Sequence, residues 1–217
     1  MAIRENGAPG KLPKPFWHSR GYLPHVEFSP LIQHVTFHLA DSLPRTKLLQ
    51  LQHELSAVQP AKRAIARRKQ LDDWMDSGYG SCILRHGTIA NLVQSSLLSF
   101  HRQRCSLFAW VVMPNHVHVL FQPLPPWTLA KIVASWKKFT ARIINQECLH
   151  LGLPQCHPIW HREYWDRYIR DENHFLRAVE YIQQNPVKAR LVKRADLWPF
   201  SSAFPGNADL QIGPPTP

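Results

Sequence analysis

The chain has 217 residues, a length that fits one domain with extended ends. Hydrophobic residues make up 44% of it, but no stretch approaches the run of about 18 apolar residues that spans a membrane. The first residues do not have the apolar segment of a secretory signal. We therefore expect a cytoplasmic protein without a membrane partner. Lys and Arg number 26 against 15 Asp and Glu, and the resulting net charge of +11 favours a polyanionic partner, with nucleic acid ahead of acidic membrane.

The N-terminal part predicts a basic arm followed by a strand. Residues 1–30 are rich in Pro, Gly, Arg and His, and Arg20 is a candidate DNA contact within this arm. Residues 31–39 alternate apolar and polar side chains, which predicts a half-buried strand. Its polar face carries His34 and His38, which we expect to be solvated, with a role beside the active site or against DNA as the alternative.

Two helical segments and two strands follow. Residues 45–76 place leucines at helical spacing with an interruption at Pro60, and residues 89–102 predict a second helix. Residues 106–113 and 117–121 are rich in β-formers on either side of a Pro-Asn pair. We therefore expect them to be neighbouring antiparallel strands.

A third helix is predicted after Thr128, whose hydroxyl can cap it. Its predicted apolar stripe consists of Leu129, Ile132, Trp136, Phe139 and Ile143. An adjacent face carries Lys131, Lys138 and Arg142. This basic face is either simply solvated or a surface that contacts DNA phosphates.

Beyond a loop at 151–158, residues 160–169 mix aromatic rings with arginines, among them Arg162 and Arg167. The mixture predicts either an amphipathic strand that packs its rings into the core or a surface that stacks bases and binds phosphates. A final helix capped by Asp171 should end at Asn185, because Pro186 disfavours helical geometry in the residue before it. The side chains that it should bury are Phe175, Leu176, Val179 and Ile182.

The predicted order of elements is β-α-α-β-β-α-(β)-α, which indicates an α+β domain with helices packed on an antiparallel sheet. We divide the chain into a basic arm at 1–30, a domain at 31–203 and a flexible tail at 204–217, with fraying from about Ser202. None of the four cysteines forms a C-x-x-C pair, so buried free thiols are expected rather than a disulfide framework.

Two histidines stand two residues apart within the second strand of the central pair. Because strand side chains alternate between faces, His116 and His118 should point one way while Val117, Val119 and Phe121 point the other. Two imidazoles held side by side on a strand make half of a metal site. In a chain with 13 histidines such a pair also arises by chance, so it needs further context.

The final helix supplies that context. Tyr181 and Asn185 are four residues apart and share one flank of the helix, beside its apolar stripe, with His174 seven residues before Tyr181. If this flank lies over the paired histidines, two imidazoles and an amide oxygen could hold a divalent metal close to a tyrosine. His174 is more readily explained as a helix-start residue than as a site residue.

The chain resembles the IS200-like single-tyrosine transposases of the HUH superfamily, and among them the REP-associated tyrosine transposases. The resemblance rests on Met-Pro-Asn before His116-Val-His118 and on Tyr181-Ile-Gln-Gln-Asn185-Pro-Val-Lys-Ala, with support from the Trp160 segment and from Trp198-Pro-Phe-Ser-Ser. It covers roughly residues 31 to 203. One departure is Arg190, where the family pattern often has glycine.

The resemblance implies a ferredoxin-like HUH domain that cuts single-stranded DNA beside a hairpin through a 5′-phosphotyrosine intermediate. It implies Tyr181 as the nucleophile and His116, His118 and Asn185 as ligands of Mg²⁺ or Mn²⁺, with no other cofactor. The expected partner is single-stranded DNA with a palindromic hairpin, and a monomer is favoured over a homodimer. Imidazole also suits Zn²⁺, Co²⁺ and Ni²⁺, so the sequence leaves the metal open.

Three alternatives remain at this point. Tyr168 is a rival nucleophile because Glu172 lies four residues on, whereas Tyr164 has no such partner. The protein could also bind and regulate palindromic repeats without cutting them. A zinc-stabilised structural protein would need a fourth strong ligand, which the sequence does not identify.

Overall fold

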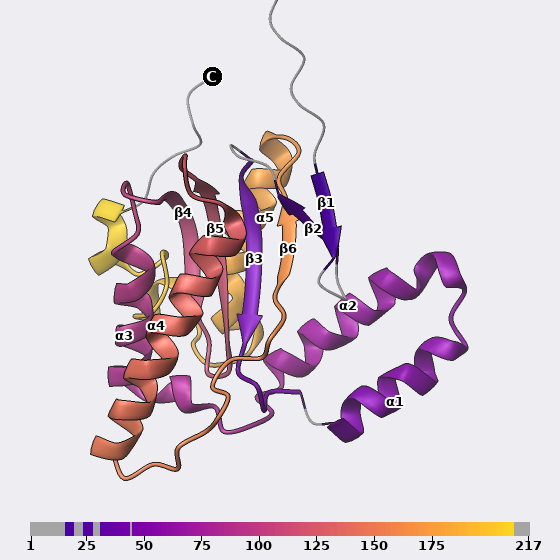
Figure 1. Ribbon diagram of the computed structural model, residues 1–217, viewed down its shortest axis with the longest axis horizontal. Coiled ribbons are helices and arrows are strands. Elements are labelled where there is room, and N and C mark those ends of the chain that lie inside the picture. Colours follow the sequence, from indigo (N-terminus) through magenta and orange to yellow (C-terminus); the bar gives the residue numbers. More distant parts are fainter. Residues whose placement is uncertain (1–15, 20–23, 28–30, 44, 211–217) are drawn as a thin grey trace, which may run out of the picture.

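The computed structural model describes residues 16–19, 24–27, 31–43 and 45–210. Its centre is a four-stranded antiparallel sheet in the order β4-β5-β3-β6, and a separate hairpin joins β1 to β2 (Figure 1). The strands are β1 (Phe16–Ser19), β2 (Pro24–Glu27), β3 (Gln33–His38), β4 (Cys105–Val112), β5 (His116–Pro123) and β6 (Trp165–Tyr168). The helices are α1 (Arg45–Ser56), α2 (Pro60–Asp76), α3 (Gly87–Leu98), α4 (Leu129–His150) and α5 (Glu172–Lys188), with short turns η1 (Ile83–Arg85), η2 (Ala195–Leu197) and η3 (Pro205–Leu210).

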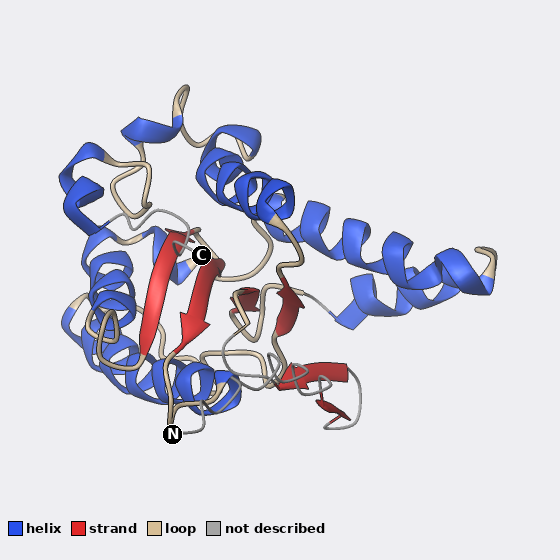
Figure 2. Ribbon diagram, turned by 90° about the horizontal axis from the view of Figure 1, so that it is seen from above, coloured by secondary structure: helices blue, strands red, loops and turns tan. Residues whose placement is uncertain are grey.

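Helices cover both faces of the sheet. Helices α3 and α4 pack on one face and α5 on the other (Figures 1 and 2). The alternation predicted for β5 is confirmed, because Val117, Val119 and Phe121 all lie in the core under α3 and α4. The predicted α+β class, with helices on an antiparallel sheet, is confirmed as well.

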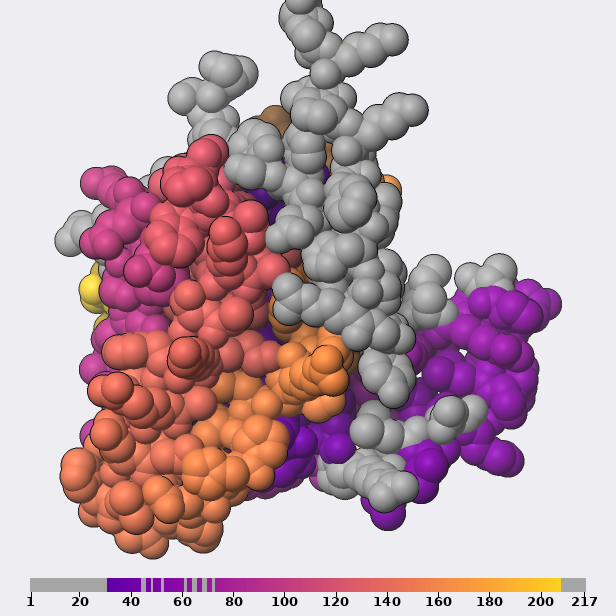
Figure 3. Space-filling view, in the orientation of Figure 1, coloured from indigo at the N-terminus to yellow at the C-terminus, as the bar shows by residue number. Residues whose placement is uncertain are grey.

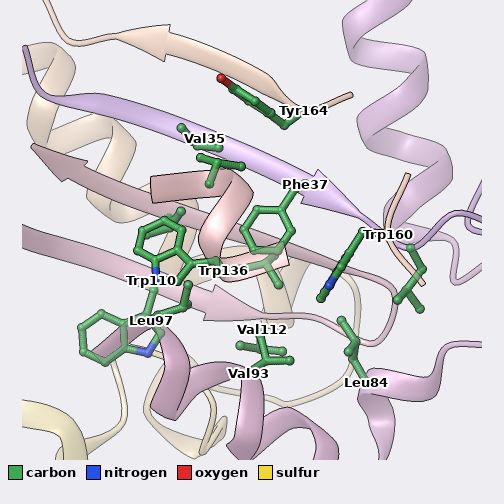
Figure 4. Packing of buried hydrophobic residues seen from close by; sticks show 14 of the residues in the cluster. Val35, Phe37, Leu84, Val93, Leu97, Trp110, Val112, Trp136, Trp160 and Tyr164 are labelled. Atoms are coloured by element: carbon green, nitrogen blue, oxygen red, sulfur yellow. The ribbon is translucent and has the colours of Figure 1, made fainter. Parts of the chain in front are cut away.

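The larger core lies between the sheet and the α3–α4 layer. Trp136 of α4 packs edge-on against Phe121 of β5, with ring centroids 5.0 Å apart, and Phe37 of β3 meets Trp160 in the same manner at 4.9 Å. Figure 4 shows Trp110 and Trp136 among the aliphatic side chains of this cluster. This layer fixes the sheet as a rigid base for the side chains on its opposite face.

The apolar stripe predicted for α4 was wrong in its second half. Phe139 is 54% exposed, while Thr140 is buried in its place. The Thr140 hydroxyl donates to the Trp136 carbonyl and accepts a hydrogen bond from Nε1 of Trp160, so a polar side chain fills a core position with its hydrogen bonds satisfied. The Thr128 cap is confirmed, since its hydroxyl accepts from the Lys131 amide.

Helix α5 begins as predicted, with the Asp171 carboxylate accepting from the His174 amide. Two details of the prediction were wrong. Leu176 is 54% exposed, and the helix runs through Pro186 to Lys188 rather than ending at Asn185. A proline within the last turn removes one hydrogen bond, but the Ala189 amide still donates to the Asn185 carbonyl and Pro186 is buried against the fold.

The ends of the chain differ from the predicted arm and tail. Part of residues 1–30 forms the β1–β2 hairpin. At the other end Ser201 and Ser202 are buried, and the Ser202 amide donates to the Trp110 carbonyl, so the chain is not frayed there. The turn η3 continues to Leu210, and the last seven residues of the predicted tail lie outside the described residues.

Helices α1 and α2 form a pair that extends away from the sheet (Figures 1 and 2). The inner end of α2 is anchored by a small cluster of its own, in which Leu71, Trp74 and Met75 are buried. No helix in the described part of the chain combines the length and the apolar character needed to cross a membrane.

The turn after α5 holds Arg190, which stands where the family pattern often has glycine, in a left-handed backbone conformation. The Arg190 amide donates to the Val187 carbonyl and the Leu191 amide to the Pro186 carbonyl, the paired bonds of a Schellman motif. This motif places Arg190 at φ +58°, in the left-handed region that glycine adopts most easily.

We expect Arg190→Gly to raise the free energy of unfolding by about 0.5 to 1 kcal/mol, because it removes the backbone strain of a side chain in the left-handed region. Urea unfolding in the presence of EDTA measures the change. Arg190→Ala is the matched control, since it removes the same side chain and keeps the strain. A glycine variant no more stable than the alanine variant would contradict this explanation.

Candidate metal and tyrosine site

The face of the sheet covered by α5 carries the paired histidines. His116 and His118 project from β5 onto this face and are buried, with their Nε2 atoms 3.1 Å apart. In the register of the sheet, Thr36 of β3 lies opposite His118 and His38 opposite His116. A strand paired on both sides holds the two rings in fixed positions.

Asn115 fixes the tautomer of His116. Its Nδ2 donates to the carbonyls of Met75 and Tyr79, so its Oδ1 must be the acceptor facing Nδ1 of His116 at 2.8 Å. The His116 proton therefore lies on Nδ1. Nε2 of His116 is left with a lone pair that points toward His118, as a metal ligand requires.

His118 is oriented from β3. Its Nδ1 lies 2.8 Å from Oγ1 of Thr36 and 3.3 Å from Nε2 of His34. With these partners on Nδ1, Nε2 of His118 faces Nε2 of His116. The sheet thus presents two imidazole nitrogens to the same point, each with a neighbour that fixes its orientation.

Helix α5 brings Asn185 and Tyr181 to this point. The side-chain amide of Asn185 lies 3.3 Å from Nε2 of His118. The ring of Tyr181 meets the ring of His118 edge-on, with centroids 5.4 Å apart, and lies 5.7 Å from the ring of His34. The spacing of four residues therefore places both side chains of α5 on the histidine pair, as the sequence analysis hypothesised.

These residues fit a divalent metal. Oδ1 of Asn185 is buried without a hydrogen-bond partner, and exchanging the amide oxygen and nitrogen would point an oxygen at the histidine pair. The donor separations of 3.1 and 3.3 Å match the separation of about 3.0 to 3.4 Å between neighbouring ligands with bonds of about 2.1 Å. Within the described ranges, no group of three or more His, Cys, Asp or Glu side chains has the spacing to hold a metal.

Burial keeps the histidines of this region neutral. Burial first, and then the nearby Lys188 ammonium, lower the pKa of His116 from its usual 6.5 to about 3. Burial also lowers the pKa of His38 to about 3, with a further contribution from His161. A neutral imidazole is the form that binds a metal, and His116 keeps that form well below neutral pH.

The same shifts predict an acid-sensitive fold. Below pH 6.5 the unfolded chain takes up protons at His38 and His116 that the folded chain does not, so stability falls as the pH drops toward 3. Each group contributes at most about 1.4 kcal/mol per pH unit. We expect urea unfolding in EDTA to give a lower free energy at about pH 5 than at about pH 7.

The control for this expectation is His38→Gln, which removes one of the two imidazoles whose pKa is lowered to about 3. The pH dependence should be shallower in this variant. A variant with the same pH dependence as the unsubstituted protein would show that His38 is not the titrating group.

Comparison with known proteins agrees with this geometry. Residues 81–185 match the family described as Transposase IS200 like, a segment that contains both histidines, Tyr181 and Asn185. Over this segment the chain is similar to the IS200-like transposases.

Two proteins similar to this chain are named for an association with REP sequences. The REP-associated tyrosine transposase of Escherichia coli (strain K12) is 30% identical over 112 residues, which span 51% of this chain and 62% of the relative. A putative REP-associated tyrosine transposase of Haemophilus influenzae is 29% identical over 136 residues, covering 52% of this chain and 77% of the relative. A solved structure of a REP-associated tyrosine transposase bound to a REP hairpin has 22% identity, 91% coverage of both chains and a TM-score of 0.46.

The rival tyrosines face the other side of the sheet. Tyr164 is buried in the core beneath α3 and α4. Tyr168 pairs with Gln33 of β3 and so shares a face with Val35 of that same core. Both rings therefore lie on the face opposite His118. Among these three candidates, Tyr181 is the one whose ring contacts the histidine pair.

Three further histidines, His34, His38 and His174, lie on the same side of the sheet as the histidine pair or at the start of α5. The expectation of a solvated face for His34 and His38 was wrong, because α5 and the segment before β6 cover that face and both side chains are buried. His38 is stacked between His161 and Trp165, at centroid distances of 4.6 and 4.9 Å. His174 lies at the start of α5, where its Nδ1 accepts from the Arg170 amide, in keeping with a role in beginning the helix.

The candidate DNA contacts lie on both sides of the sheet. Lys131, Lys138 and Arg142 are exposed on α4, on the face of the sheet opposite the histidine pair. Arg162 is exposed on the segment before β6, a region that adjoins α4 in Figure 3. Arg167 is exposed within β6 and pairs with His34, so it lies on the face of the sheet that carries the histidine pair. Arg20 lies outside the described residues, and all six stay predictions.

Thr36 and Asp76 are neighbours of the site that were not predicted from the sequence. Thr36 had a recognisable position, since it lies midway between His34 and His38 on the same strand face. Asp76 ends α2, forty residues before His116, and places Oδ1 4.0 Å from Nε2 of that histidine. No spacing in the sequence signals this contact, because it depends on how the α1–α2 pair docks.

Proposed function

We propose that this protein is a metal-dependent single-stranded DNA endonuclease and strand transferase that cuts beside DNA hairpins through a 5′-phosphotyrosine intermediate. The observation that supports this most strongly is the contact between the Tyr181 ring and the ring of His118, within a cluster that also includes His116 and Asn185. A nucleophile beside a set of metal ligands is the arrangement that phosphoryl transfer requires.

The proposed reaction exchanges one phosphodiester for another. The phenolic oxygen of Tyr181 attacks the scissile phosphorus and forms a bond to it, while the bond from phosphorus to the 3′ oxygen breaks. The phenolic proton is lost to solvent and the departing oxygen gains one, which leaves a free 3′-OH and a 5′-phosphotyrosine. Because the intermediate keeps the phosphodiester's energy, rejoining to another 3′-OH requires no nucleotide cofactor.

The ligand set in this proposal is His116, His118 and Asn185, with Mg²⁺ or Mn²⁺ as the metal. A bound divalent cation would neutralise charge on the scissile phosphate and favour in-line attack by a phenol whose pKa is ordinarily near 10. Three neutral ligands leave the charge of such a cation undiminished. The protein's own part is to hold the His116 imidazole neutral, to orient both imidazoles, and to keep the Tyr181 ring against His118.

The proposed substrate is single-stranded DNA that carries a palindromic hairpin. The net charge of +11 and the REP-associated relatives support it. Because one chain contributes Tyr181, both histidines and Asn185, a single copy can assemble the site, which supports a monomer as the acting species.

The test is incubation of the protein with an end-labelled hairpin oligonucleotide and Mn²⁺, followed by a denaturing gel. We expect a cleaved strand and a slower species in which DNA is covalently bound to protein, both lost when EDTA is added. Hairpin binding without cleavage in any divalent metal would contradict the proposal. It would instead favour a non-cleaving regulator of palindromic repeats.

A further inference from the structure

A carboxylate from outside the matched family segment lies beside the proposed metal ligands. Asp76 is the last residue of α2, and its Oδ1 is 4.0 Å from Nε2 of His116, the atom that faces His118. Its side chain is 11% exposed. The family match begins at residue 81, so this residue belongs to the part of the chain that the match does not cover.

The position of Asp76 is fixed from both sides. The carbonyl of Met75, its neighbour, accepts a hydrogen bond from Nδ2 of Asn115, the residue that orients His116. On the other side, Oδ2 of Asp76 accepts a hydrogen bond from Nζ of Lys188 at 2.7 Å, in the last turn of α5. One carboxylate oxygen is therefore held by a lysine, and the other faces the metal site.

The ligand set has a charge imbalance that this carboxylate can correct. Two imidazoles and an amide are neutral, whereas a divalent cation bound to them in a buried site lacks a compensating anion. Oδ1 of Asn185 is buried without a hydrogen-bond partner at the same place, in keeping with a cation there. The 4.0 Å between Oδ1 of Asp76 and Nε2 of His116 exceeds the separation of about 3.0 to 3.4 Å expected for neighbouring ligands, but a unit charge at such a distance acts strongly on a buried ion.

We propose that Asp76 is the charge-balancing carboxylate of the metal site, acting from just outside the ligands, and that Lys188 competes with the metal for it. This inference rests on the proposed function only in assuming that His116, His118 and Asn185 bind a divalent cation. It makes the docking of the α1–α2 pair part of the metal centre. It also gives Asp76 and Lys188 opposite effects on metal affinity, although they form one ion pair.

The experiment titrates Mn²⁺ alone, without DNA, into the full-length protein after EDTA treatment and dialysis, with calorimetry to measure the dissociation constant. We expect Asp76→Asn to weaken Mn²⁺ binding about tenfold or more, because the compensating charge is lost. Lys188→Met should strengthen binding by about threefold or more, because the competing cation is removed. Asp73→Asn is the matched control: it lies one turn earlier in α2 and 3.7 Å from the same Lys188 ammonium, and it should change affinity by less than about twofold.

The opposite signs separate this proposal from a structural role. If Asp76 and Lys188 only fasten α2 to α5, both substitutions weaken Mn²⁺ binding, and that result overturns the proposal. Undiminished binding by Asp76→Asn overturns it as well, while leaving the three proposed ligands in place. If the unsubstituted protein binds no Mn²⁺, the ligand assignment and this inference fail together, and Tyr181 must then be tested separately.

Discussion

Tyr181→Phe is expected to abolish cleavage and covalent attachment while leaving hairpin binding within about twofold of the unsubstituted protein. The substitution deletes the attacking oxygen and keeps the ring that packs against His118 and His34. We expect a loss of at least about a thousandfold in the cleavage rate, because no other nucleophile occupies that position. Denaturing gels measure the rate, and fluorescence anisotropy with the labelled hairpin measures binding.

The matched control is Tyr168→Phe, since Tyr168 lies on the strand that pairs with β3 but on the other face of the sheet. This variant should cut at the rate of the unsubstituted protein. A covalent adduct that persists in Tyr181→Phe would refute the assignment of the nucleophile.

His118→Ala is expected to have the second largest effect, a loss of about a hundredfold or more in Mn²⁺ affinity together with undetectable cleavage. His118 is central to the cluster, because its Nε2 lies 3.1 Å from that of His116 and 3.3 Å from the Asn185 amide. Removing this ring takes away one ligand and leaves the other two without their common neighbour. Calorimetry with Mn²⁺ and the gel assay report the two losses.

His86→Ala is the control for His118→Ala. His86 is exposed before α3 and its side chain caps no helix, so this variant should bind Mn²⁺ and cut DNA normally. Melting curves in EDTA should show that His118→Ala still unfolds cooperatively. A folded His118→Ala protein that keeps metal-dependent cleavage would exclude this histidine from the ligand set.

The sequence predicted the parts of the site that depend on local periodicity. A period of two placed His116 and His118 on one face of a strand, and a spacing of four placed Tyr181 and Asn185 on one flank of a helix. That these two faces meet followed from the family resemblance and from the need of an amphipathic helix to dock on the sheet. The structure brings them together at hydrogen-bonding distance.

What the sequence could not predict depends on packing between distant segments. His34 was expected to be solvated because a polar strand face reads as exposed, and its burial is evident only once α5 is seen to cover that face. Thr140 replaces Phe139 in the core because Trp160, twenty residues later, supplies a donor to its hydroxyl. The approach of Asp76 to His116 joins residues forty positions apart through the docking of α2.

The tyrosine attached to DNA can be identified directly, because trypsin separates the three candidates into different peptides. Tyr181 is the one tyrosine between Arg177 and Lys188, whereas Tyr164 and Tyr168 fall on either side of Arg167. After reaction with the hairpin oligonucleotide and Mn²⁺, followed by nuclease and trypsin digestion, mass spectrometry should find the nucleotide mass on the peptide of residues 178–188. The same mass on a peptide with Tyr164 or Tyr168, or cleavage of DNA with no nucleotide on any tyrosine, would contradict the account.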